Sequence, residues 1–199
     1  MNLSKTIFRT LLILSLVAGY TAFTYGQQVD PSYGMSLQLI IGSDESGPRG
    51  DIPNELSTVT KQIRSQFGFS NYRLASTFLG RLTNAGSFSY KSASNIFGKE
   101  SQGQPVFLEW NINEFHPAPG AKGGQGFVSQ GFNFGARVPV NTSIAGGDSK
   151  ASTVINYEQI GVTLRKISVP ENVPTLVGTL NLPGTSGTIF LIMTVRSAD

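Results

Sequence analysis

The sequence lacks several residue types on which common functions depend. It contains no cysteine, one histidine and one tryptophan in 199 residues, and 14% of its residues are charged. Without cysteine the chain forms no disulfide and carries no lipid anchor at an amino-terminal cysteine. One histidine without an acidic cluster does not supply the ligands of a usual zinc site. No Gly-x-Ser-x-Gly stretch offers a nucleophile elbow. We therefore expect no enzyme, no cofactor, and no catalytic, cofactor-binding or metal residues.

A membrane-spanning hydrophobic run is also missing at the amino terminus. The apolar stretch Leu11–Gly19 is too short to cross a bilayer as a helix, and it follows the basic residues Lys5 and Arg9. Small residues then stand at the −3 and −1 positions before Gln27, which is typical of a cleaved secretory signal. We expect residues 1–26 to be a signal peptide and 27–199 a single domain. An uncleaved amino-terminal anchor is the alternative.

The chain has almost no excess of either charge once the signal is removed. The signal takes Lys5 and Arg9 from the 15 basic residues and nothing from the 12 acidic ones, which leaves 13 against 12. No cluster of Lys and Arg remains to follow a phosphate backbone, so we expect no nucleic-acid partner. A domain of this size buries about 70% of its unfolded surface and needs no disulfide. Glycine- and serine-rich strands without cysteine favour a bacterial envelope location, in the periplasm or outer membrane.

One segment has the periodicity of a helix, Asp51–Gly68. Asp51 is predicted to cap its start and Gly68 to provide a left-handed stop, while Lys61 and Arg64 face water. Four apolar residues follow one another at steps of three or four along a single stripe: Leu56, Val59, Ile63 and Phe67.

Strand patterns account for the rest of the chain. Met35–Gly42 is short and apolar, and the segment after Pro105 alternates, with Val106, Leu108, Trp110 and Ile112 on one side. A second row is predicted from Val128, Phe132, Phe134, Ala136 and Val138. His116–Gly126 is expected to be a flexible hairpin loop, and the last two strands to flank a turn at 183–187. The predicted fold is α+β and mainly β: an antiparallel meander or sheet with one N-terminal amphipathic helix.

Few side chains qualify as candidates for chemistry. His116 follows Glu114 by two residues, but we interpret it as a solvated loop residue rather than a base. One loop contains three carboxylates that could be oxygen ligands for calcium: Asp44, Glu45 and Asp51. Their spacing matches no known calcium-binding loop. Trp110, with Phe127, Phe132 and Phe134, could form a platform for carbohydrate, although its place in an alternating row favours the core.

A pair of segments in the second half carries a more specific pattern. Pro139 stands in the sequence Arg137–Val140, and a proline is expected to end the hydrogen-bond ladder there. The segment Thr153–Ile167 is expected to return antiparallel. Its apolar alternation changes phase beside Gly161, which predicts a bulge or bend.

This pair resembles the core domain of bacterial secretins, the outer-membrane gates of type II and type III secretion and of type IV pili. The matching residues are Gly135, Val138, Pro139, Tyr157, Gly161, Val162 and Leu164. The resemblance implies secretin-like β-structure in a small exported protein, without catalysis or cofactor.

Three hypotheses for function follow. The first is a non-enzymatic envelope protein that makes contacts with protein partners or with itself, in or near a secretion- or pilus-type assembly, with association to a membrane possible. The second is a small outer-membrane β-barrel. The third is a β module that binds carbohydrate or another small ligand.

Overall fold

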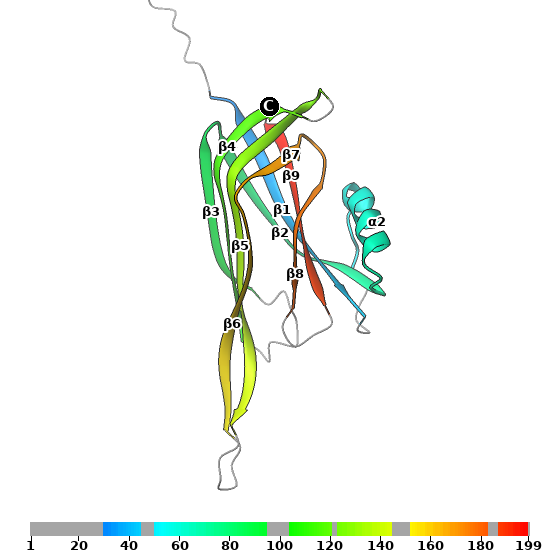
Figure 1. Cartoon of the computed structure of the whole chain (residues 1–199), viewed down its shortest axis with the longest axis vertical. Helices are drawn as coiled ribbons and strands as arrows, with labels where there is room; N and C mark the ends of the chain where they lie inside the picture. Colours follow the sequence, from blue (N-terminus) through cyan, green and yellow to red (C-terminus); the bar gives the residue numbers. More distant parts are fainter. Residues whose placement is uncertain are drawn as a thin grey trace, which may run out of the picture. The chain divides into compact units, whose positions relative to one another are not determined.

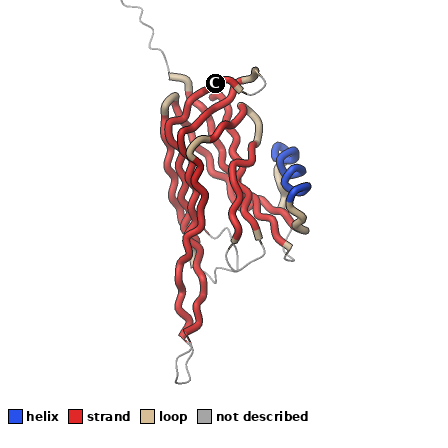
Figure 2. Tube along the Cα trace, in the orientation of Figure 1, coloured by secondary structure: helices blue, strands red, loops and turns tan. Residues whose placement is uncertain are grey.

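Strands form most of the computed structural model, which describes residues 30–44, 50–94, 104–120, 123–144, 152–182 and 187–198. The elements in chain order are β1 (Ser32–Ser43), the 3-10 helix η1 (Asn54–Leu56), α2 (Ser57–Gln66), β2 (Asn71–Thr83), β3 (Gly86–Ser94), β4 (Val106–Pro119), β5 (Gln125–Ile144), β6 (Ser152–Leu164), β7 (Ile167–Pro170), β8 (Thr175–Asn181) and β9 (Thr188–Ala198). Figures 1 and 2 show the predominance of strands in the described part. The expected signal peptide, residues 1–26, lies outside the described residues.

The strands form two sheets that share one core. The first sheet has the order β2-β1-β9-β8, and the second has the order β3-β4-β5-β6, with β7 paired to β5. The strand pairs within both sheets are antiparallel. The chain passes from the first sheet to the second at the turn Asn84–Ala85, between β2 and β3. The second sheet is the predicted meander, whereas the first places the two ends of the described chain, β1 and β9, side by side.

Alternating side chains of both sheets meet in the core. On β4 the predicted row Val106, Leu108, Trp110 and Ile112 is buried, as is the row Phe132, Phe134, Ala136 and Val138 on β5. Apolar residues of β1 and β9, among them Leu37 and Leu191, pack against them from the other sheet. One member of the predicted rows is wrong, since Phe127 is buried in place of Val128.

The error at Val128 has a local cause. The β4–β5 register is the same on both sides of this point but leaves out Glu114, whose φ is +48°, and Gln130, which would face it. The buried Ser129 hydroxyl donates to the Asn113 carbonyl at 2.6 Å, which fixes the irregularity. Both strands change the face that meets the core at this point, from Ile112 to Phe115 on β4 and from Phe132 back to Ser129 and Phe127 on β5.

The one α-helix among the described residues follows β1 and is not N-terminal, which corrects the sequence prediction. Leu56, Val59 and Ile63 of the predicted stripe are buried against the outer face of the first sheet, together with Ile40, Tyr72, Phe190 and Ile192. Lys61 and Arg64 are exposed, as expected. Among the described residues, no helix is long and apolar enough to span a membrane.

Both predicted ends of the helix are wrong. No side chain caps either η1 or α2, so Asp51 does not have that role, and Pro53 stands directly before η1. Proline is tolerated there because the first N–H groups of a helix have no partner within it. The helix ends where Phe67 becomes extended, with φ −123°, and Gly68 does not have a positive φ.

The predicted loop His116–Gly126 is largely strand. β4 continues to Pro119 and β5 begins at Gln125, so the connection is short. The two prolines in this segment do not stop the strand. The pairing of β3 with β4 ends at Gly86–Phe115, so from His116 onward β4 pairs with β5 alone and its other edge tolerates a missing N–H.

Candidate functional site

The hairpin of β5 and β6 contains a two-stranded ribbon that extends beyond the rest of its sheet (Figure 1). The last β4 partner of β5 is at Phe107–Arg137, whereas β5 and β6 stay paired to Ile144–Ser152. Residues 138–144 and 152–158, which we call the ribbon, thus pair only with each other among the described strands. Isolated two-stranded ribbons are marginally stable in water, so this one stands to gain from a third strand.

The pairing of this hairpin confirms one prediction and corrects two. Thr153–Leu164 returns antiparallel to β5, as expected, with Pro139 opposite Tyr157. The strand does not end at Pro139, because β5 has no β4 neighbour there and the missing N–H is tolerated at an edge. No bulge occurs at Gly161, which lies opposite Gly135 in a register that is continuous from Phe132 to Ile144.

The change of apolar phase in β6 reflects two environments. Ile160, Val162 and Leu164 pack against the core within the sandwich. Tyr157 and Ile155 point to the opposite face and are 42% and 40% exposed, respectively. The apolar residues of β6 therefore change face between Tyr157 and Ile160 although the register does not change, because the hairpin leaves the core at this point.

Three exposed apolar side chains gather on the outer face of this region. Phe107, Ile155 and Tyr157, which we call the aromatic patch, are each about 40% exposed. The rings of Phe107 and Tyr157 lie 5.7 Å apart, and the Arg137 guanidinium lies 5.4 Å from the Phe107 ring centre. The Tyr157 hydroxyl donates to the Pro105 carbonyl at 3.4 Å. These contacts order the patch without covering it.

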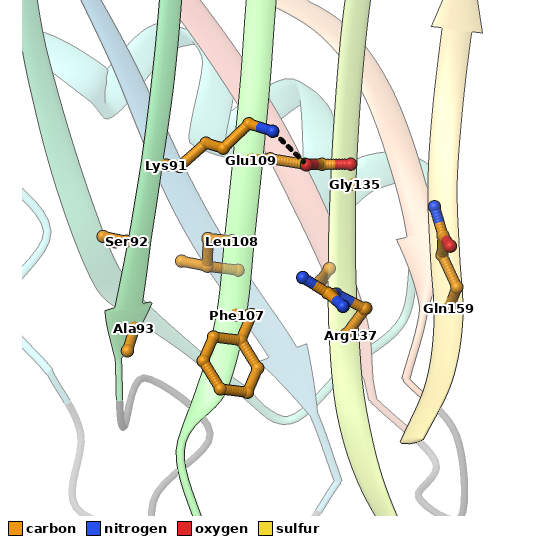
Figure 3. Close-up of a pocket in the computed structure, with 10 residues that line it drawn as sticks. Lys91, Ser92, Ala93, Phe107, Leu108, Glu109, Gly135, Arg137 and Gln159 are labelled. Carbon is orange, nitrogen blue, oxygen red and sulfur yellow. Dashed lines mark ion pairs between the residues drawn. The ribbon is translucent and has the colours of Figure 1, made fainter.

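A hollow of about 220 Å³ adjoins the patch on the same face (Figure 3). Its floor includes Gly135, which lies opposite Gly161, and neither residue places a side chain over the sheet. Lys91 and Glu109 stand on one side, with Nζ and Oε2 3.5 Å apart; the Lys91 side chain is largely exposed and that of Glu109 about half exposed. Arg137 and Gln159 stand on another side. The hollow carries mixed charge and is open, which suits a protein surface better than a reaction centre.

The two facing glycines, Gly135 and Gly161, are not equivalent. A Cβ added at Gly161 would lie 2.7 Å from the Phe134 carbonyl oxygen, a backbone atom that cannot give way easily. A Cβ at Gly135 would meet only the Glu109 side chain, at 3.4 Å. Close approach of the two strands therefore requires glycine at 161 alone.

The other candidate residues do not assemble into a site. His116 lies in β4 with its Nδ1 3.4 Å from the Asn84 side-chain oxygen. Asp44 accepts hydrogen bonds from the backbone N–H and the hydroxyl of Ser70, and Glu45 lies outside the described residues. Within the described ranges, no group of three His, Cys, Asp or Glu side chains could hold a metal.

Trp110 and the three phenylalanines proposed as a platform are buried, with Trp110 1% exposed. This confirms the core interpretation of Trp110 and leaves these rings unable to stack on a sugar. Sequence reasoning missed Phe107. An apolar residue at an outward position of a strand whose inner row is already apolar is the signal that could have found it.

No protein-family model and no curated protein matches the sequence.

Proposed function

We propose that this chain is an exported, non-enzymatic envelope protein that binds a protein partner through the ribbon of β5 and β6. The observation that carries the proposal is a paired ribbon that has no third strand among the described residues and that lies beside the aromatic patch. An extended partner segment adds to such an edge through main-chain hydrogen bonds, and its side chains gain specificity from adjacent pockets. The aromatic patch and the hollow beside it supply those contacts.

The resemblance to secretins supports the choice of partner class. All seven residues that carry it lie on β5 and β6, with Gly135 opposite Gly161 and Pro139 opposite Tyr157. We therefore propose that the partner belongs to a secretion- or pilus-type assembly in the periplasm or outer membrane. Export of the chain rests on the signal pattern of residues 1–26.

The magnitude of one contact follows from the exposure of Tyr157. A buried aromatic side chain removes about 150–250 Å² from water. Because Tyr157 is 42% exposed, roughly 80 Å² remains for a partner to cover. At about 25 cal/mol per Å² this contributes about 2 kcal/mol, or roughly 30-fold in affinity.

The experiment is affinity capture from envelope extracts with the purified protein, followed by measurement of the dissociation constant for the protein retained. The variant Tyr157→Ser is expected to bind roughly 30-fold more weakly, whereas Val173→Ser, at a residue 49% exposed outside the ribbon, binds as the parent does. A monomeric protein that captures no envelope partner, or equal weakening by both variants, would contradict the proposal.

A further inference from the structure

The outer face of the first sheet is only half covered. Helix α2 and the residues packed with it cover the half that contains Ile40 and Phe190. The other half forms an open groove of about 370 Å³ over β2, β1 and β9, at the start of the helical segment. It lies on a different sheet from the ribbon, so it is independent of the function proposed above.

Two arginines stand on either side of a glycine in this groove. In the register of the sheet, Gly34 of β1 lies opposite Arg81 of β2 and opposite Arg196 of β9. Neighbouring strands are about 4.8 Å apart, so the two arginine backbones are separated by about 10 Å. Gly34 places no side chain between them. The sheet surface between the two arginines is therefore bare at Gly34, and both arginines line the groove.

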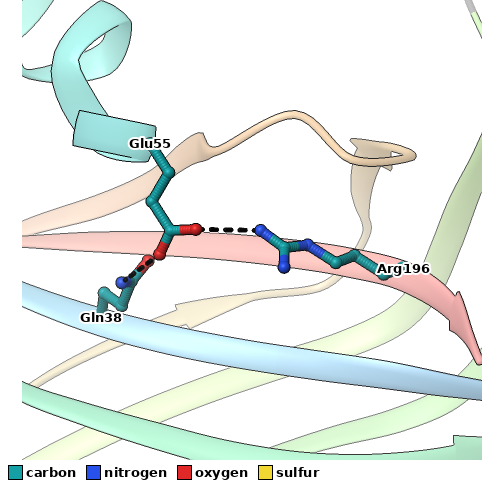
Figure 4. Close-up of polar contacts among 3 residues, drawn as sticks. All are labelled: Gln38, Glu55 and Arg196. Atoms are coloured by element: carbon teal, nitrogen blue, oxygen red, sulfur yellow. Dashed lines mark hydrogen bonds and ion pairs between the residues drawn. The ribbon is translucent and has the colours of Figure 1, made fainter. Parts of the chain in front are cut away.

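Arg196 is held in place by a polar network (Figure 4). Its Nη2 donates to Glu55 Oε2 at 3.0 Å, and Gln38 Nε2 donates to Glu55 Oε1 at 3.4 Å. Gln38 is 4% exposed, so this network is anchored in the sheet. The Arg196 side chain remains 58% exposed, and a guanidinium has five donors, so the bond to Glu55 leaves others for a ligand.

The charge of the groove is positive. Arg81 has no ion pair with any described residue, so the groove carries two cations against the single carboxylate of Glu55. The next row of the same face adds hydroxyl groups, with Ser36 opposite Thr194. Planar guanidinium groups match carboxylates with paired hydrogen bonds, and hydroxyls can donate to the same oxygens.

We propose that this groove binds a carboxylate-bearing ligand over Gly34, between Arg81 and Arg196. Arg81 and Arg196 contact the carboxylate, while Glu55 and Gln38 are positioning residues that orient Arg196. The carboxylate comes either from a small dicarboxylic acid or from an acidic peptide segment, since both present the same group.

The experiment is an NMR titration of the full chain with glutarate, with the capped peptide acetyl-Glu-Leu-Glu-amide, and with sulfate as a control anion. Glutarate or the peptide is expected to shift the backbone resonance of Gly34, and Arg81→Gln to weaken that binding about tenfold. Arg165→Gln, at an exposed arginine after β6, is expected to bind as the parent does.

The ratio of the two carboxylate affinities distinguishes the sources. Tighter binding of the peptide assigns an acidic segment, and binding of glutarate at least as tight assigns a small acid; either result supports the carboxylate site. Three results would overturn it: no shift at Gly34 with either probe, equal affinity in Arg81→Gln and the parent, or sulfate binding as tight as the carboxylates.

Discussion

The pair of facing glycines in β5 and β6 gives a sharp test of the hairpin register. Gly161→Ala would place a Cβ 2.7 Å from the Phe134 carbonyl oxygen, so one strand must move. Overpacking of this kind costs about 1–3 kcal/mol. Gly135→Ala, directly across the pair, meets only the flexible Glu109 side chain at 3.4 Å. Removing a glycine also restricts the unfolded chain, which stabilises by about 0.4–1 kcal/mol where no clash opposes it.

The two variants should therefore change stability in opposite directions. Urea unfolding followed by the fluorescence of Trp110, the single tryptophan and a buried one, measures both. We expect Gly161→Ala to lower the free energy of unfolding by about 1–3 kcal/mol and Gly135→Ala to leave it unchanged or slightly raised. A bulge at Gly161, one of the two irregularities that the apolar pattern alone predicts, would give the new methyl group room. Equal effects of the two variants would thus refute the continuous register.

Three further predictions concern the helix, the ion pair and a tyrosine. Ile63→Ala, at a residue 0% exposed, is expected to lower the free energy of unfolding measured by urea titration by about 2–5 kcal/mol. The exposed Lys61→Ala should lower it by less than about 0.5 kcal/mol. Similar losses in the two variants would contradict the packing of α2 in the core. Arg196→Gln should cost at most about 1 kcal/mol, a loss that shrinks in high salt, because both partners are about half exposed; a larger, salt-independent loss in thermal unfolding would contradict this. Burial raises the pKa of Tyr72 above 10.0, so the folded state keeps this proton longer and stability falls as pH rises past that value; Tyr72→Phe should lessen that fall, and an unchanged pH profile would rule out the shift.

The alternating strands could be predicted from sequence because burial on one face is a local property with a period of two. The row on β4 and the row from Phe132 to Val138 on β5 are therefore buried as expected. The helix stripe from Leu56 to Ile63 is buried for the same reason, at its own period. The prediction was wrong at the ends of the helix. Asp51 and Gly68 are suitable cap residues, but packing of Leu56 and Phe67 sets where the helix begins and ends.

Non-local pairing explains the other differences. The sequence predicts that a strand ends at Pro139, because nothing in the local sequence reveals that β4 stops short of it. The ribbon depends on that difference in strand length, and so does the exposure of Tyr157. The groove beside Gly34 depends on three strands and η1 that are distant in sequence, with Glu55 and Arg196 separated by 141 positions. No spacing rule brings such residues together.

The role of the ribbon as a docking edge is tested most directly by a photo-crosslinking amino acid placed at position 155 in the chain expressed in its own cells. We expect illumination to join position 155 to one envelope protein, while the same group at position 173, which is more exposed than position 155 but outside the ribbon, yields none. No adduct from position 155, or the same adducts from both positions, would contradict the account.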